Sequence, residues 1–215
     1  TAVVTNSDDP DNHGRLKLKY PWMSDDAESD WARVASAGAG PETGLFMANN
    51  VGDEVLVSFE HGDFNRPIVL GGLWSGTHAV PAAPNAAAAG EKHMIRVWQS
   101  LNGHYILMHD DADDKMELAT AGGHTILMDD ANKLLELKTT GGHKVTMDDD
   151  GKKLEIKTTG GHTITLDDTG KKVIVKSSGD VEIKSAMNMK IEAGGMLDLK
   201  ASGILNIKGS MVNIN

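Results

Sequence analysis

An eight-residue repeat fills the C-terminal end of the sequence and constrains the fold more than any other feature. From Gly179 onward, the units GDVEIKSA, MNMKIEAG, GMLDLKAS and GILNIKGS follow one another without a gap. Two apolar residues in each unit alternate with polar ones, which is the pattern of a strand with one buried face. Each unit therefore predicts one short strand and one bend. The apolar residues are Val181, Ile183, Met189, Ile191, Leu197, Leu199, Leu205 and Ile207.

A longer version of the same repeat lies upstream. The triplet GGH recurs at 122–124, 141–143 and 160–162, so the period there is nineteen residues. The end of each longer unit resembles the eight-residue unit, and its beginning adds a second strand and a turn rich in Asp, Asn, Gly and Lys. Such clusters between alternating runs are typical of hairpins. We therefore predict two-strand steps over residues 103–178 and single-strand steps over 179–215.

The length of the short repeat predicts an assembly of three chains. A β-helix made by one chain needs about twenty or more residues per coil, whereas eight residues cover only one face. Three copies, each forming one side of a triangular prism, would place the eight apolar residues on a shared axis and leave no open sheet edge. Each buried apolar side chain contributes roughly 1.5 to 3 kcal/mol. We predict an intertwined triple-stranded β-helix, or β-prism, in which the homotrimer is the folding unit.

The first part of the chain has a different organisation. Short alternating runs are joined by clusters of Asp, Gly, Asn and Pro, which predicts a small closed barrel of the OB type over residues 1–78. Residues 79–102 contain three Ala/Pro clusters, and we expect a linker followed by an entry strand. The whole chain is therefore predicted to be all-β. The five expected barrel strands lie within 13–22, 31–37, 44–48, 53–60 and 66–74.

Composition excludes several classes of function. The chain has no cysteine, so it offers neither disulfides nor thiolate metal ligands. Its net charge of -10 repels nucleic acid and anionic lipid. Every apolar run is too short to span a membrane, and the first residues lack the pattern of a signal peptide. We therefore expect no nucleic-acid partner and only transient contact with a membrane.

Histidines and aspartates recur in register along the longer repeat. One interpretation is a ladder of metal sites or of acid/base pairs. The other is that each histidine begins a strand and each aspartate begins a turn, where its side chain bonds its own backbone. We favour the second, because catalysis needs one preorganised site and not four equal copies, and we predict no catalytic residue, metal or cofactor. The residues are His104, His124, His143 and His162, with Asp110, Asp129, Asp148 and Asp167.

Methionines recur at strand positions that the alternation assigns to the interior. We interpret them as flexible core-filling side chains and not as ligands. These residues are Met108, Met128, Met147, Met187 and Met189.

A set of short motifs in the first part of the chain resembles the OB domain of VgrG and baseplate-V type spike proteins. The repeats that follow resemble the tapering β-prism of the same proteins, so the resemblance covers nearly the whole chain. The motifs are GRLK at 14–17, YPW at 20–22, WARV at 31–34, VGDEV at 51–55, FEHGD at 59–63 and RPIVLG at 66–71.

The resemblance implies a structural and mechanical role. Proteins of this family form the central spike of contractile phage tails, type VI secretion systems and extracellular injection particles. It implies a homotrimeric needle, assembled in the cytoplasm without a signal peptide, that is driven through a target envelope when a sheath contracts. The implied partners are hub, baseplate and tail-tube proteins at the N-terminal end and effector cargo. A PAAR-type cap would dock on Val212, Asn213, Ile214 and Asn215.

Two other classes of protein stay open at this point. A trimeric tail fibre or receptor-binding module would end in a globular, aromatic-rich head, whereas this sequence ends in a predicted strand. A β-helical polysaccharide-degrading enzyme would need a groove lined by non-repeating charged residues, whereas the polar face here is uniform.

Some phage spikes hold iron at the tip through a His-x-His motif. The last histidine here is His162, so that site is not expected.

Overall fold

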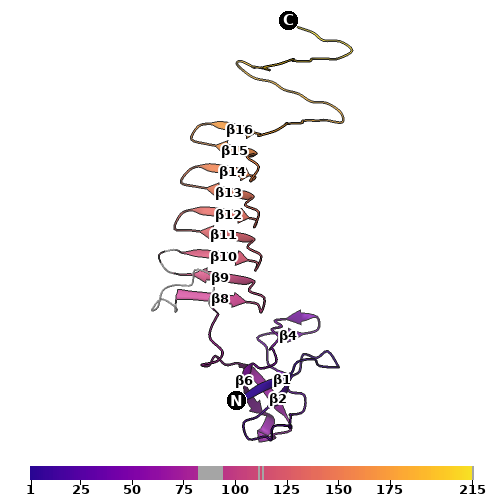
Figure 1. Ribbon diagram of the computed structural model, residues 1–215, viewed down its shortest axis with the longest axis vertical. Helices are drawn as coiled ribbons and strands as arrows, with labels where there is room; N and C mark the ends of the chain where they lie inside the picture. Colours follow the sequence, from indigo (N-terminus) through magenta and orange to yellow (C-terminus); the bar gives the residue numbers. More distant parts are fainter. Residues whose placement is uncertain (82–93, 111, 113, 215) are drawn as a thin grey trace. The chain divides into compact units, whose positions relative to one another are not determined.

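The computed structural model describes residues 1–81, 94–110, 112 and 114–214. These residues form strands and one short 3-10 helix (η1, Glu60–Gly62), as the predicted all-β class requires (Figure 1). Among them there is no helix with the length and apolar character needed to cross a membrane. The chain divides into two compact units, Thr1–Thr140 and Gly141–Asn215, and each is described by itself.

The N-terminal part of the first unit is a closed barrel of five strands. Their order in the sheet is β2-β1-β6-β7-β3. The two edges of this sheet meet through Leu16 and Ala32, whose backbones exchange N–H···O bonds of 2.9 and 2.8 Å. This bridge closes the sheet into the barrel that the sequence predicts. The strands are β1 (Ala2–Asn6), β2 (Lys17–Lys19), β3 (Arg33–Val34), β6 (Glu54–Phe59) and β7 (Pro67–Gly72).

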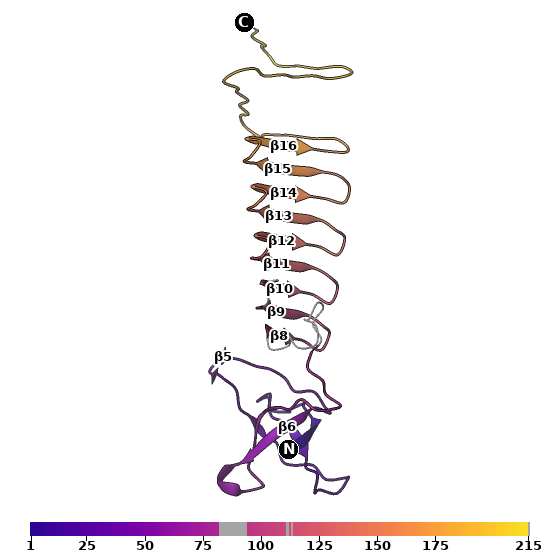
Figure 2. The same cartoon turned by 90° about the vertical axis from the view of Figure 1, so that its left-hand side faces the viewer.

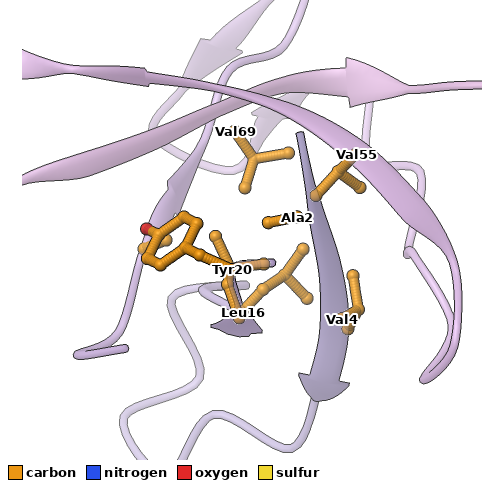
Figure 3. Packing of buried hydrophobic residues seen from close by; sticks show 8 residues of the cluster. Ala2, Val4, Leu16, Tyr20, Val55 and Val69 are labelled. Atoms are coloured by element: carbon orange, nitrogen blue, oxygen red, sulfur yellow. The ribbon is translucent and has the colours of Figure 1, made fainter. Parts of the chain in front are cut away.

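Buried apolar side chains from opposite sides of the barrel point toward one another (Figure 3). Ala2 and Val4 of β1 alternate with the exposed Val3, so β1 has the same one-sided pattern as the predicted strands. The sequence analysis nevertheless missed β1. The cluster consists of Ala2, Val4, Leu16, Leu18, Tyr20, Ala32, Val55 and Val69.

The strand predicted within residues 44–48 is wrong. The chain instead forms a short hairpin of β4 (Ala39–Gly40) and β5 (Thr43–Gly44), and residues 45–48 are exposed and outside any strand. Gly44 has φ 143°, and a Cβ there would lie 2.2 Å from the Gly38 carbonyl oxygen. The close backbone contact therefore requires glycine at this position.

The rest of the first unit is a ladder of short antiparallel strands, each paired with the next in sequence (Figures 1 and 2). The prediction of an entry strand before residue 103 agrees with β8. The linker preceding it lies largely outside the described residues. The strands are β8 (Ile95–Gln99), β9 (Tyr105–His109), β10 (Lys115–Ala119), β11 (Thr125–Asp129) and β12 (Leu134–Lys138).

The second unit continues the same two-strand pattern. Its strands pair antiparallel over their whole length, with five residues facing five. This confirms the nineteen-residue steps as pairs of strands joined alternately by a Gly-Gly bend and an Asp-containing turn. The strands are β13 (Lys144–Asp148), β14 (Lys153–Lys157), β15 (Thr163–Asp167) and β16 (Lys172–Lys176).

The eight-residue repeats follow β16 as extended chain without strand pairing (Figure 2). Bends fall at 178–179, 186–187, 194–195 and 202–203, which is the spacing of eight that the repeat predicts. Within the residues that the structure describes, none of these segments pairs with another strand. The bends are thus confirmed, and strand pairing between chains stays a prediction.

Candidate functional site

One face of the ladder in the second unit is entirely apolar. The strands pair residue for residue, and alternate side chains point to the same face, so the apolar positions of all four strands line up in two columns. The columns contain Val145, Met147, Leu154, Ile156, Ile164, Leu166, Val173 and Val175. We call this set the apolar face.

The apolar face is not covered by any other part of the second unit that the structure describes. Ile156 and Ile164 lie on strands with a neighbour on both sides, and yet each is 41% exposed; Val173, on the last strand, is 69% exposed. Neighbouring strands shield the sides of these residues, so the remaining exposure is on the face itself. A continuous exposed apolar surface of this kind marks an interaction site.

The first unit carries an equivalent set on β9 to β12. Met108 and Met128 belong to it, and Met147 belongs to the apolar face of the second unit; that these methionines fill a core stays a prediction. The sequence analysis named only the eight-residue repeats as an assembly surface. The alternation of apolar and polar residues in the nineteen-residue repeats could have identified the ladder as an assembly surface as well. The set is Ile106, Met108, Met116, Leu118, Ile126, Met128, Leu135 and Leu137.

The opposite face of the second unit is polar except for Ile174, which faces Thr165. Asp148 faces Lys153, Lys153 also faces Asp167, and Asp167 faces Lys172, so opposite charges alternate up one column. Cross-strand pairs of opposite charge stabilise a solvated sheet face. The ladder of this unit therefore has one face suited to water and one suited to burial.

In the first unit, the ladder face opposite the exposed apolar set carries a second core at the beginning of the ladder. Tyr105, Leu107 and Ala119 are buried there, with Ile95 and Val97 packed against them. The Tyr105 hydroxyl donates to Glu117 Oε1 at 3.0 Å. Burial, and secondly this bond, raises the pKa of Tyr105 to about 12. The sequence analysis did not identify this cluster.

The eight apolar residues of the short repeats are all at least half exposed in the single chain, from Met189 at 51% to Ile183 at 74%. Polar residues two positions apart lie on the same side of the extended segments, because Lys184 Nζ contacts Glu182 Oε1 at 2.5 Å and Lys190 pairs with Glu192. The alternation of the sequence is thus present in the conformation. Burial of the apolar side stays a prediction.

The predicted cap-docking end is also exposed. Residues 212–214 lie outside any strand, with Val212 48% and Ile214 89% exposed, and Asn215 lies outside the described residues. This part of the prediction is untested.

The recurring histidines and three of the four aspartates occupy the positions expected from the structural interpretation, whereas the Asp110 carboxylate pairs with Arg96 at 2.7 Å. Each of the four histidines immediately precedes a strand. The Asp129, Asp148 and Asp167 side chains each accept a hydrogen bond from the backbone N–H three residues later, at 2.6–2.8 Å. In the described part of the chain, no three His, Asp or Glu side chains come together as a possible metal site.

The closed five-stranded barrel gives the N-terminal part the architecture of an OB domain. Residues 1–74 match the family described as the Type VI secretion system/phage-baseplate injector OB domain. This confirms the OB prediction and the resemblance to VgrG and baseplate-V type spike proteins.

Curated relatives carry the same resemblance. The spike protein VgrG3 of Vibrio cholerae is 40% identical over 77 residues, covering 34% of this chain and 8% of that protein. The spike protein VgrG1c of Pseudomonas aeruginosa is 28% identical over 132 residues, covering 53% of this chain and 18% of that protein. The second similarity therefore extends beyond the OB domain. The chain corresponds to less than a fifth of either relative.

A third relative has a name that describes an activity. The actin cross-linking toxin VgrG1 of Vibrio cholerae is 35% identical over 75 residues, covering 33% of this chain and 7% of that protein.

Proposed function

We propose that this chain forms the spike of a contractile injection apparatus, as a homotrimer that pierces a target envelope mechanically when the sheath contracts. The observation that carries the proposal is the apolar face, which a single copy leaves in water. Three copies related by a threefold axis would bury this face and its equivalent in the first unit. The similarity to type VI secretion spike proteins supports the same function.

The short repeats fit the distal part of such a spike. Each of the eight apolar residues listed for these repeats would point to the threefold axis, and backbone groups that have no partner in one chain would pair with the neighbouring chains. A sheet without open edges has no strand from which unfolding or aggregation can begin. A three-chain prism of this kind is suited to transmit force along its axis without catalysis.

The proposed partners follow from the order of the two parts. The OB domain would join hub, baseplate and tail-tube proteins. The tip residues 212–215 would receive a PAAR-type cap, and effector cargo would travel with the spike. The chain would be made inside the producing cell and carried out of it, or into a target cell, with the particle.

Sedimentation equilibrium tests the assembly, with an expected mass of three times 22.9 kDa. A well-folded monomer would contradict the proposal.

The function is tested with particles whose spike carries both Ile156→Asp and Ile164→Asp. We expect these particles to cause no leakage of target vesicles when the sheath contracts. Thr146→Asp on the polar face is the matched control and should retain it. Tight binding of the isolated trimer to whole target cells would instead support a receptor-binding fibre.

A further inference from the structure

The two edges of the ladder in the second unit differ in charge. Figure 1 shows the two kinds of connection at opposite edges. We call the residues 141–144, 157–163 and 176–179 the bend edge, and 148–153 and 167–172 the turn edge. The bend edge contains three lysines and two histidines but no carboxylate, whereas the turn edge contains five aspartates and four lysines.

Two lysines of the bend edge have no counter-charge within the described residues. Lys157 faces Lys144 on one neighbouring strand and Thr163 on the other, and Lys176 faces Thr163. Both lysines are exposed, and neither side chain makes a hydrogen bond or ion pair in the part of the chain that the structure describes. A lysine placed opposite another lysine is unfavourable in an isolated sheet.

Two aspartates of the turn edge are in the corresponding situation. Asp149 and Asp168 begin the turns after β13 and β15, and their backbone carbonyls accept from the N–H groups of Lys152 and Lys171. Their carboxylates are exposed and have no partner within the described residues. They differ in this from Asp148 and Asp167, whose carboxylates bond their own turns.

Cyclic symmetry brings these two edges together. In a prism with three identical sides, each corner joins one edge of a chain to the opposite edge of the next, which is a heterologous contact. Symmetry-related residues lie at the same height along the axis. Lys157 ends β14 and Asp149 begins the turn from β13 to β14, so these residues differ in height by no more than about one strand spacing of ~4.8 Å. The same relation holds for Lys176, which ends β16, and Asp168, which begins the turn from β15 to β16.

We propose that Lys157 and Lys176 of one copy pair with Asp149 and Asp168 of the next copy at each corner of the trimer. This inference rests on the proposed homotrimer and adds to it a fixed order of edges around the axis. The lysines are nineteen residues apart and so are the aspartates, so one register satisfies both pairs. The edge charges would thereby specify alignment, while the apolar face supplies most of the stability.

Charge reversal and rescue test the pairing. The double variants Lys157→Glu/Lys176→Glu and Asp149→Lys/Asp168→Lys each place like charges at all three corners. We expect each trimer to dissociate in denaturant about tenfold faster than the unmodified trimer at low salt, with a smaller difference at high salt. The four-site variant, which exchanges the charges, should return to within about threefold of the unmodified rate.

The control variant is Glu155→Lys, which reverses a charge at the centre of β14 between Thr146 and Thr165. We expect it to dissociate less than about threefold faster than the unmodified trimer. If the doubles dissociate at the unmodified rate, or if the four-site variant dissociates as fast as the doubles, the edge pairing is wrong while the trimer stands. A monomeric unmodified chain would overturn the proposed function as well.

Discussion

At the residue scale, the side chain of Asp9 holds together the loop that leads into β2. Its carboxylate accepts from Arg15 Nη2 at 2.7 Å and Nε at 3.0 Å, and also from the backbone N–H groups of Asp11, His13 and Arg15. The Arg15 guanidinium, followed by these backbone donors, holds the pKa of Asp9 well below its usual range. The loop conformation therefore depends on a charged Asp9.

We expect Asp9→Asn to destabilise the OB domain at neutral pH. Because the pKa of Asp9 is depressed by folding, its contribution is fully present above the ordinary carboxyl pKa near 3.8 and is lost as pH falls through the folded value. Urea midpoints at pH 7 and at lower pH should therefore converge for the two proteins as acid is added. A difference that stays constant or grows in acid would contradict this role.

Tyr105 provides a second test at this scale. We expect Glu117→Gln to lower the pKa of Tyr105 from about 12 toward the ordinary 10.0, because the carboxylate that opposes the phenolate is removed. The chain has two tyrosines, so a Tyr20→Phe background isolates the signal in an ultraviolet pH titration. An unchanged midpoint would show that burial alone sets this pKa.

Some of these residue roles were predictable and others were not. The aspartates at turn starts were predictable, because their partners are local backbone groups a few positions away. Asp9 was not, because its bonds exist only when the loop from residue 9 to residue 15 closes on itself. The second core around Leu107 was also missed, because β9 is apolar on both faces and alternation does not show which of the two is buried.

At the scale of elements, the Gly-Gly bends set the step of the ladder. Gly161 has φ 88°, a left-handed conformation that residues with a side chain avoid, whereas its neighbour Gly160 does not need such a φ. We expect Gly161→Ala to lower the free energy of unfolding by about 1 kcal/mol or more, and Gly160→Ala to have a smaller effect. Chemical denaturation of the two variants checks this; equal effects would show that the bend tolerates either residue.

The repeats made most of the elements predictable. Their period located β9 to β16 and the bends of the short repeats, because the same pattern recurs and each copy supports the others. The barrel lacks such repetition. There, the apolar run at residues 45–47 predicted a strand, but whether a run pairs depends on a neighbouring edge that a local pattern does not reveal.

At the scale of the whole molecule, the proposed trimer depends on the apolar residues of the short repeats. We expect Ile191→Asp, and separately Leu199→Asp, to abolish the heat-resistant trimer, because three carboxylates would meet at one level in a dry core at a cost of several kcal/mol each. Asn206→Asp, at a polar position, should leave the trimer intact. Sedimentation before and after heating measures both. A heat-resistant trimer of either first variant would contradict the inward assignment.

The proposed assembly was predictable only from the number of residues needed to enclose a hydrophobic core. Eight residues are too few to surround a core, so the sequence favours several chains, and the exposed apolar face agrees with that view. The number three depends on the geometry of a prism, which a single copy does not contain.

The change from paired strands to unpaired extended chain after Lys176 bears on the order in which a spike is built. Strands β13 to β16 find their hydrogen-bond partners within one polypeptide, so this ladder can begin to form as soon as it leaves the ribosome. In the proposed trimer, the segments beyond would pair only after two other copies have joined. We therefore expect the proposed trimer to assemble from the ladder toward the tip, so that the tip folds last.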